Sequence, residues 1–195
     1  MNKNELLKIK EKALEEHIPI IMDDTLETIE KYIGNSKINK ILEIGTAVGY
    51  SAICFTQFLS ENGKIDTIER EKDRVEEAKE NIKKAEVQEY IQIYEGDAVE
   101  ILPNLNDKYD MIFIDAAKGK YPFFLQQSLR LLNSDGIIFA DNILYKGYVM
   151  SDYNKHKQRT AVRNLREFIK RLQENETLET NILEAGDGLA IAKKI

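Results

Sequence analysis

Short apolar runs alternate with helical patterns along most of the chain. Runs of mostly apolar residues bounded by turn residues predict buried strands at 40–45, 64–70, 91–97, 109–116 and 136–142. Apolar residues at helical spacing predict helices at 50–61, 71–85, 121–132 and 159–173, with a short helical turn near 99–105. Strands that alternate with helices are typical of a parallel sheet that is covered by helices on both faces.

Both ends of the chain depart from this alternation. Residues 4–16 and about 23–34 predict two helices ahead of the first strand. The last segment, "LETNILEAGDGLAIAKKI", has two strand-like runs joined through Asp187-Gly188, a dipeptide favoured in tight turns, and it predicts an antiparallel hairpin. The expected fold is therefore α/β and Rossmann-like, with a seven-stranded, mostly parallel sheet and a C-terminal antiparallel hairpin. We expect one domain, 1–195, with a short N-terminal helical segment (1–36) and a core (37–195).

Composition excludes several classes of protein and site. No apolar run approaches the ~20 residues of a membrane span, and the charged N-terminus "MNKNELLKIKEKALEEH" lacks the apolar core of a secretory signal, so we expect a cytoplasmic protein. The single cysteine, Cys54, lies in the apolar stretch "SAICFTQFL", which predicts a packing role and excludes disulfide frameworks and thiolate clusters. With only His17 and His156 present, a metal would depend on oxygen ligands.

The charge of the chain is unevenly distributed. The net charge is −6, yet residues 143–171 contain eight Lys or Arg against Asp152 and Glu167, which gives this segment +6 and leaves −12 elsewhere. The simplest interpretation of such a segment is a solvated helix face.

A loop with two glycines follows the first predicted strand. In "ILEIGTAVGYSA", Gly45 and Gly49 lie where small residues let a ligand contact N–H groups at a helix N-terminus. Dinucleotide-binding loops have G-x-G-x-x-G, so the G-x-x-x-G spacing here fits a pyrophosphate less well. Glu69 ends the second strand, where an acidic residue can bind the ribose diol that NAD and S-adenosylmethionine share. A strand-end glutamate that faces water is an equally simple alternative.

Together, "EIGTAVGYS", the strand ending at Glu69 and "GDA" (96–98) resemble the class I S-adenosylmethionine-dependent methyltransferases, from about residue 17 to the C-terminus. The resemblance implies that Ser51 and the backbone near Ile21 hold the methionine end of this cofactor. It also implies that Glu69 holds the ribose, and Asp97 with Ala98 the adenine. The expected cofactor-binding residues are Ile21, Glu43, Gly45, Ser51, Glu69, Asp97, Ala98 and Asp115.

Two further strands end in polar residues, Asp115 in one and Asp141-Asn142 in the other. The carboxyl ends of parallel strands beside a switch point meet in one crevice, so these side chains should converge. Two carboxylates and an amide suit Mg²⁺, Mn²⁺ or Ca²⁺. Taken singly, Asp115 is better explained as a helix cap and Asp141-Asn142 as a turn. Jointly, buried strands ending in uncompensated carboxylates would be costly without a cation between them.

Lys118 follows Asp115 by three residues. Beside a divalent cation and partly desolvated, it should have a lowered pKa and could act as a general base on a substrate hydroxyl. The D-A-A-K (115–118) and D-N (141–142) motifs, with the glycine loop, resemble the cation-dependent O-methyltransferases, which include the catechol and caffeoyl-CoA enzymes. The resemblance implies that Asp115, Asp141 and Asn142 bind Mg²⁺, that Lys118 is the catalytic base, and that the product is a methyl ether.

Two departures from the catechol enzymes bear on the substrate. Ala117 stands where their motif has an aromatic gate, and the chain has no tryptophan. Ala190 follows D-G-L, where the catechol enzyme has a glutamate that holds the second hydroxyl. A small catechol would be poorly held, so we expect a wider pocket and a larger substrate.

The basic segment directly follows Asp141-Asn142 and includes Tyr145, Tyr148 and Tyr153, which suits it to phosphates and stacked bases. The expected RNA-binding rim is Lys120, Lys146, Arg159, Arg163 and Arg166, with further charge from Lys118, Lys155, Lys157, Lys170 and Arg171. The text "KILEIGTA-x-GYSAI", "FIDAAKG-x-Y" and "GDGLAI-x-KK" resembles the bacterial tRNA 5-hydroxyuridine methyltransferases. This resemblance implies a tRNA partner and 5-methoxyuridine at the wobble position, since the 5-hydroxyl and neighbouring O4 form a chelating pair as in a catechol.

Two alternatives stay open at this point. The first is the same chemistry on a small catechol-like or phenolic compound. The second is an RNA-binding or regulatory module that keeps S-adenosylmethionine as a structural ligand, although such a module needs neither metal ligands nor a base. Because members of the family pair, we also expect a homodimer.

Overall fold

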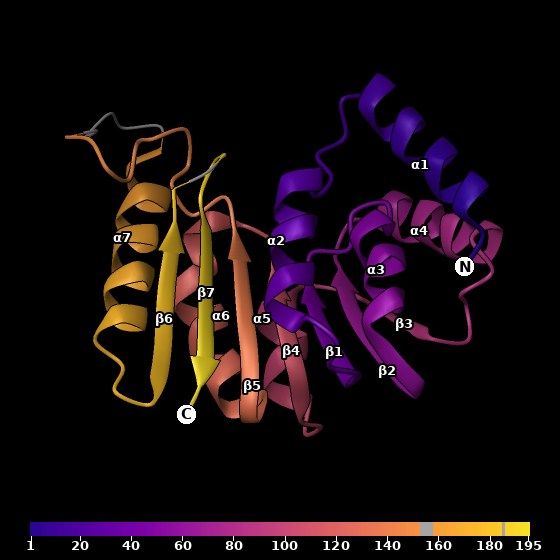
Figure 1. Ribbon diagram of the computed structural model, residues 1–195. Coiled ribbons are helices and arrows are strands. Elements are labelled where there is room, and N and C mark those ends of the chain that lie inside the picture. The colour runs from indigo at the N-terminus through magenta and orange to yellow at the C-terminus, as the bar shows by residue number, and fades with distance from the viewer. Residues whose placement is uncertain (153–157, 185) are drawn as a thin grey trace. The chain divides into compact units, whose positions relative to one another are not determined.

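The structure is a computed structural model that describes residues 1–152, 158–184 and 186–195. The chain divides into two compact units, residues 1–101 and 102–195 (Figure 1). The expectation of a single domain over 1–195 stays a prediction.

The first unit is built on three parallel strands in the order β3-β2-β1. Their bounds are Ile38–Ile44 (β1), Leu59–Glu69 (β2) and Ile91–Glu95 (β3). The apolar run of β1 is fully buried, as its composition predicted. The register places Ile44 opposite Ile68 and Glu69 opposite Glu95, so the strands reach their carboxyl ends side by side.

The helices of the first unit bury apolar stripes against this sheet and against one another. They are α1 (Lys3–Glu15), α2 (Asp23–Ile33), α3 (Tyr50–Phe55), the 3₁₀ turn η1 (Thr56–Phe58), α4 (Lys72–Lys84) and the short α5 (Ala98–Ile101). In α4, Val75, Ala78 and Ile82 recur at helical spacing and are buried, and the helix packs on β2 and β3. Cys54 is buried in α3, which confirms its packing role.

The second unit combines a parallel and an antiparallel part in the order β4-β5-β7-β6. Its strands are Tyr109–Ile114 (β4), Leu132–Asp141 (β5), Leu178–Leu183 (β6) and Leu189–Lys194 (β7). Its helical elements are η2 (Leu102–Asn104), η3 (Lys118–Lys120), α6 (Tyr121–Leu131) and α7 (Arg159–Gln173). β4 and β5 run parallel, α6 packs on both, and α7 packs along α6 and on β6.

The C-terminal hairpin is antiparallel as predicted, but its connection is longer than a two-residue turn, since β6 ends at Leu183 and β7 begins at Leu189. Asp187 instead tethers the segment that follows β5. Its carboxylate accepts the N–H of Lys146, and its carbonyl accepts that of Leu144 at 2.8 Å. Gly188 has φ +85° and lies against the Leu144 side chain, so a larger residue would be strained there.

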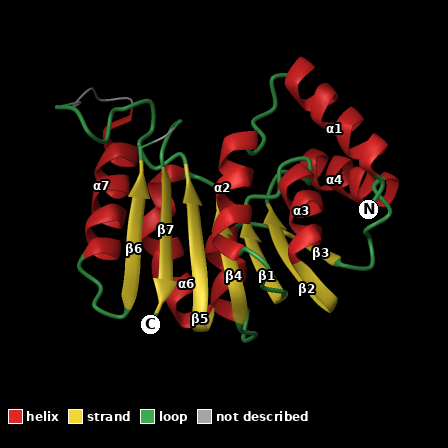
Figure 2. Cartoon of the chain, viewed as in Figure 1, coloured by secondary structure: helices red, strands yellow, loops and turns green. Residues whose placement is uncertain are grey.

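These elements confirm the expected fold class, a Rossmann-like, mostly parallel seven-stranded sheet with a C-terminal antiparallel hairpin and covering helices (Figure 2). Within the described ranges, none of the helices has the length and apolar character needed to cross a membrane.

Candidate functional site

The glycine loop of the first unit lies at the carboxyl end of β1. The N–H groups of Gly45 and Thr46 both donate to the carbonyl of Ile68, at 3.1 and 3.2 Å, which ties the loop to the end of β2. Gly49, the residue before α3, has φ +80°, and a Cβ added there would lie 3.3 Å from that of Ala78. The two glycines therefore give the loop a backbone path that side chains would obstruct.

A buried polar network supports this loop from below. Glu43 is fully buried, and its two carboxylate oxygens accept hydrogen bonds from the hydroxyls of Ser51 and of Thr67, the latter at 2.5 Å. Thr67 also bonds Thr46 at 2.6 Å. Glu43 and Ser51, which we expected to bind the cofactor, are thus hydrogen-bonded to each other. Their part in cofactor binding stays a prediction.

Asn81 of α4 also supports the loop. It is buried, and its side-chain amide donates to the carbonyl of Val48 at 3.0 Å. Sequence reasoning missed Asn81 and Thr67, because a polar residue within a helix or strand gives no local sign of the loop that it contacts.

The carboxylate of Glu69 closes the loop from the neighbouring strand. It accepts three backbone N–H groups, from Ala47 at 2.9 Å, Arg70 at 2.9 Å and Glu71 at 3.0 Å. A carboxylate has about four acceptor positions, so one is left for a ligand hydroxyl. Glu69 is half-buried, which suits a residue that both orders the loop and faces a ligand.

The remaining cofactor candidates of this unit lie near the same strand ends or ahead of α2. Gly96 donates its N–H to the carbonyl of Glu69 at 2.8 Å, which brings the end of β3 beside that of β2. Asp97 is exposed and accepts the N–H of Val99 at 2.8 Å, while Ala98 is half-buried. The side chain of Ile21 is buried in the segment between α1 and α2.

Replacing Glu69 by glutamine should weaken binding of S-adenosylmethionine by about tenfold or more. The amide nitrogen cannot accept a hydrogen bond, and bonds to a charged group are worth roughly 1.5–3 kcal/mol. Calorimetric titration of the variant with S-adenosylhomocysteine measures the effect, and Glu71→Gln is the control because Glu71 is exposed. Equal affinity for Glu69→Gln and the parent protein would remove Glu69 from the binding set.

In the second unit, Asp115, Lys118 and Asn142 come together at the carboxyl ends of β4 and β5. The parallel register pairs Ile114 with Ala140, so Asp115 and Asp141 leave the sheet side by side. The Lys118 ammonium donates to Asp115 Oδ1 at 2.9 Å, to the carbonyl of Asp141 at 3.2 Å and to Asn142 Oδ1 at 3.5 Å. The predicted convergence of these residues is present, around a positive charge that the protein itself supplies.

The electrostatics of this group follow from its burial. Burial, followed by the negative charge of Asp115, raises the pKa of Asp141 from 3.8 to about 6, although the N–H of Asn142 bonds Asp141 Oδ1 at 2.7 Å. Burial lowers the pKa of Lys118, but Tyr121 and Asp115 raise it by more, and the net direction is upward. The lowered lysine pKa that we expected is therefore not produced by the protein groups alone.

The donor set fits a hard cation. The Asp115 carboxylate and the Asn142 amide oxygen both accept hydrogen bonds from the Lys118 ammonium. The Asp141 carboxylate is buried, and burial followed by the charge of Asp115 raises its pKa. Carboxylate and amide oxygens are the ligands that hard divalent cations prefer. The described ranges contain no cluster of three or more His, Cys, Asp or Glu residues, so a bound ion would complete its coordination with the amide, water or substrate oxygens. Metal binding by Asp115, Asp141 and Asn142 stays a proposal.

Two residues at this group were not foreseen. Tyr121 is fully buried; its hydroxyl accepts a hydrogen bond from Lys118 at 2.8 Å and donates to the carbonyl of Asp141 at 2.8 Å. Asn164 of α7 donates to the carbonyl of Gly119 at 2.6 Å and so holds the turn that carries Lys118. The sequence signals for Tyr121 are its position three residues after Lys118 and its place at the end of the motif "FIDAAKG-x-Y".

The cationic side chains of the expected RNA-binding rim are exposed, but one of them is hydrogen-bonded to the protein backbone. Lys120, Lys146, Arg159 and Arg163 are exposed. Arg166 is also exposed, but its guanidinium donates to the carbonyls of Val149 at 3.0 Å, Tyr148 at 3.2 Å and Ser151, so it orders the chain after β5. The guanidinium of Arg166 is therefore engaged within the protein, and its part in RNA binding stays a prediction. Tyr145 and Tyr148 are half-buried and meet edge to face, while Tyr153, Lys155 and Lys157 lie outside the described residues.

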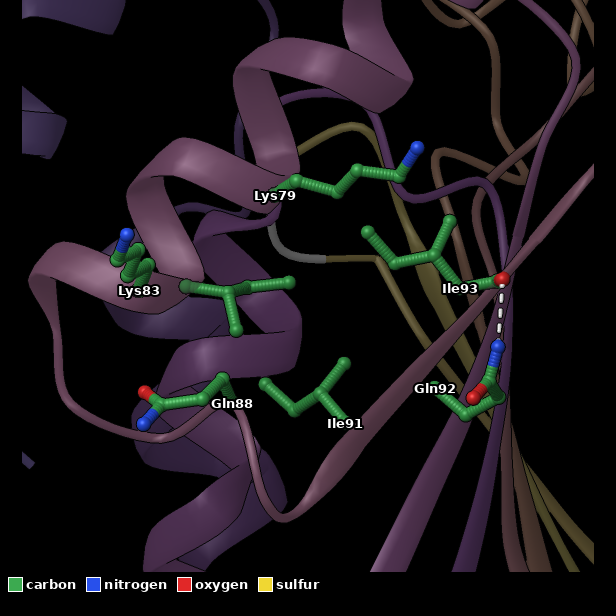
Figure 3. Close-up of a pocket in the computed structure, with 7 residues that line it drawn as sticks. Lys79, Lys83, Gln88, Ile91, Gln92 and Ile93 are labelled. Carbon is green, nitrogen blue, oxygen red and sulfur yellow. Dashed lines mark hydrogen bonds between the residues drawn. The ribbon is translucent and has the colours of Figure 1, made fainter.

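A pocket of about 380 Å³ lies between α4 and β3 in the first unit (Figure 3). Its walls are Lys79, Ile82, Lys83, Gln88, Ile91, Gln92 and Ile93. Lys79 is paired with Glu76 at 2.7 Å, and the Gln92 amide donates to the carbonyl of Ile93 at 3.0 Å. None of the predicted site residues lines this pocket.

Comparisons with known proteins agree with the geometry. The family model described as O-methyltransferase matches residues 4–195. A catechol O-methyltransferase from Niastella koreensis is 35% identical, over 78% of this chain and 72% of that protein. A candidate caffeoyl-CoA O-methyltransferase from Arabidopsis thaliana is 33% identical over 98% and 87%. A solved structure of a candidate caffeoyl-CoA O-methyltransferase from Staphylococcus aureus has a TM-score of 0.89 at 35% identity, over 97% of this chain and 92% of that chain.

Proposed function

Because this chain belongs to the O-methyltransferase family and is an S-adenosylmethionine-dependent O-methyltransferase of the catechol and caffeoyl-CoA type, we propose that it uses a divalent cation and Lys118 to methylate a hydroxyl that has a second oxygen beside it. One observation carries the proposal. Asp115, the backbone of Asp141 and Asn142 place three oxygens within 3.5 Å of the Lys118 ammonium, so cation ligands and base form one group.

In this proposal the residues have distinct roles. Asp115, Asp141 and Asn142 would hold the cation, which when bound stabilises the substrate oxyanion as a Lewis acid. Lys118 takes the proton of the substrate hydroxyl as the oxygen attacks the sulfonium methyl, and the products are a methyl ether and S-adenosylhomocysteine. Because Tyr121 and Asp115 raise the pKa of Lys118 by more than burial lowers it, the lysine would act as a base only with the positive charge of a bound cation beside it.

For the substrate we propose 5-hydroxyuridine at the wobble position of tRNA. Its 5-hydroxyl and O4 form the required oxygen pair. Ala117, beside Lys118, is exposed and small, which suits a bulky substrate better than an aromatic gate would. Lys120, Lys146, Arg159 and Arg163 are exposed cations suited to phosphates.

A small catechol-like or phenolic compound is the second candidate. It is favoured by the similarity to a protein named catechol O-methyltransferase. It is disfavoured by Ala190, which is buried in β7 and offers no polar group to hold a second hydroxyl.

Charge reversal separates the two substrates. With S-adenosylmethionine and Mg²⁺, we expect the purified protein to methylate hydroxyuridine-containing tRNA, and Arg159→Glu with Arg163→Glu to raise the KM for tRNA by tenfold or more at physiological salt while leaving kcat unchanged. Lys83→Glu, which reverses a cation of the pocket on α4, is the matched control. The tRNA proposal is wrong, and a small phenol is the substrate, if the protein does not methylate this tRNA and its turnover of free catechols is the same in the parent and in both charge-reversal variants.

Cells that lack this protein provide a second test. Mass spectrometry of their wobble nucleosides should show 5-hydroxyuridine accumulating and 5-methoxyuridine missing. If the protein were instead a regulatory module that only binds S-adenosylmethionine, Lys118→Ala and Asp141→Ala would restore the normal nucleosides. Cytoplasmic location and a homodimer stay predictions.

A further inference from the structure

We propose that Tyr121 is the positioning residue for Lys118, holding its amine at the reaction site through a hydrogen bond to a hydroxyl that is not itself an expected cation ligand. The inference rests on the proposed function, in which Lys118 is the base.

The local backbone brings the three side chains to one side. Asp115 precedes Lys118 by three residues and Tyr121 follows it by three, and Lys118 begins the 3₁₀ turn η3 (Lys118–Lys120). Tyr121 is the first residue of α6, so the same element that carries the lysine continues into the helix that packs on β4 and β5. Lys118 donates to the neighbour on each side of it in the sequence, to Asp115 Oδ1 at 2.9 Å and to the Tyr121 hydroxyl at 2.8 Å.

The Tyr121 hydroxyl is itself fixed from two directions. It donates to the carbonyl of Asp141 at 2.8 Å, and its remaining lone pairs face the Lys118 ammonium at 2.8 Å. Its ring packs edge to face on Phe168 of α7, with the ring centroids 5.2 Å apart at 73°. A fully buried ring with a bonded hydroxyl cannot rotate away from the lysine without leaving polar groups unpaired.

Helix α7 braces the lysine turn from the same side. Asn164 donates to the carbonyl of Gly119 at 2.6 Å, and Phe168 lies one helical turn further along. The lysine turn and the tyrosine are therefore both held by one helix. Packing of α7 then sets the position of the Lys118 amine as well as the stability of this unit.

The hydrogen-bond partners of Lys118 include expected cation ligands and one hydroxyl that is not an expected ligand. Asp115 and Asn142 supply oxygens suited to a cation, so they are not reserved for the lysine. The Tyr121 hydroxyl is not among the expected cation ligands. Tyr121 therefore gives the amine a hydrogen-bond partner that remains available when Asp115 is engaged by a cation.

Tyr121→Phe tests this role, because it removes the hydroxyl and retains the ring. We expect kcat to fall by about tenfold to a hundredfold, as for a misplaced reacting group, with the affinity for S-adenosylhomocysteine within twofold of the parent. In protein treated with a chelator, Lys118 should also be acetylated several-fold faster, as followed by peptide mass spectrometry, because its amine loses one of its closest partners. Tyr109→Phe is the control, since Tyr109 is equally buried but begins β4.

The outcomes distinguish failure of this inference from failure of the function. Unchanged kcat and unchanged acetylation in Tyr121→Phe, beside an inactive Lys118→Met, would overturn the positioning role and leave the function standing. Full activity in Lys118→Met would overturn both. A fall in kcat that Tyr109→Phe reproduces, with an equal loss of thermal stability, would make Tyr121 a packing residue only.

Discussion

Lys118→Met should lower kcat by about three orders of magnitude while S-adenosylmethionine binds as tightly as before. A positioned general base contributes roughly 10²–10⁴-fold, and methionine keeps the length and apolar stem of lysine without its amine. The side chain is 14% exposed, so the substitution leaves the surface almost unchanged. Steady-state kinetics on the accepted substrate, with calorimetry for the cofactor, separate chemistry from binding.

The same variant makes a second prediction about the cation. In the parent protein the ammonium engages Asp115 and Asn142, two of the expected metal ligands, so it competes with a metal for their oxygens. Lys118→Met should therefore bind Mn²⁺ at least as tightly as the parent, measured by calorimetry or electron paramagnetic resonance. Lys120→Met, an exposed lysine two residues away, is the control and should leave kcat on a small phenol unchanged. Loss of Mn²⁺ binding in Lys118→Met would contradict competition and make the lysine a support for the metal ligands.

The sequence was sufficient to predict the strands and most of the helices, because burial on both faces of a parallel sheet leaves runs of apolar residues that few other structures need. The sequence was less informative where the first part of a strand contains polar residues. β2 begins at Leu59, where a helix to residue 61 was expected, and the register shifts between its first pair and Lys40. β5 likewise begins at Leu132, with a shift around Asp135 and Gly136. Hydrogen bonding to the neighbouring strand determines where β2 and β5 begin. The sequence of one segment does not show which strand it will pair with.

The site shows the same division. Asp115, Lys118 and Asn142 could be brought together in advance, because strand ends in a parallel sheet meet at a known edge. The side chains that hold them could not. Asn81, Asn164 and Arg166 each bind backbone carbonyls of a distant loop, and such bonds depend on tertiary contacts without a sequence period.

Asp141→Asn should stabilise the protein against unfolding while it removes metal-dependent activity. Asp141 is buried, and burial together with the charge of Asp115 raises its pKa to about 6, so the ionised carboxylate costs stability when no cation is bound. Asparagine keeps an acceptor for the N–H of Asn142 and carries no charge. A buried group that serves function at the expense of stability is expected at an active site.

The pH dependence of this effect follows from linkage. Below pH about 4, Asp141 is protonated in both the folded and the unfolded chain, and the variant and parent should have similar free energies of unfolding. Between pH about 4 and 6 the unfolded chain loses this proton first, so the parent loses stability relative to the variant as the pH rises. The shift of roughly two units corresponds to about 1–3 kcal/mol, fully present above pH about 6.

Urea denaturation in the presence of a chelator, at several values of pH from 4 to 8, measures this difference. Asp152→Asn is the control, because it makes the same substitution at an exposed position. Adding Mg²⁺ at pH 8 should then raise the melting temperature of the parent but not of Asp141→Asn. Only the parent has the buried carboxylate that the cation would bind, and a ligand that binds the folded state stabilises it. An Asp141→Asn protein that is less stable than the parent at pH 8 without metal would show that the carboxylate is already balanced by the protein, and it would remove the electrostatic reason for placing a cation between these strands.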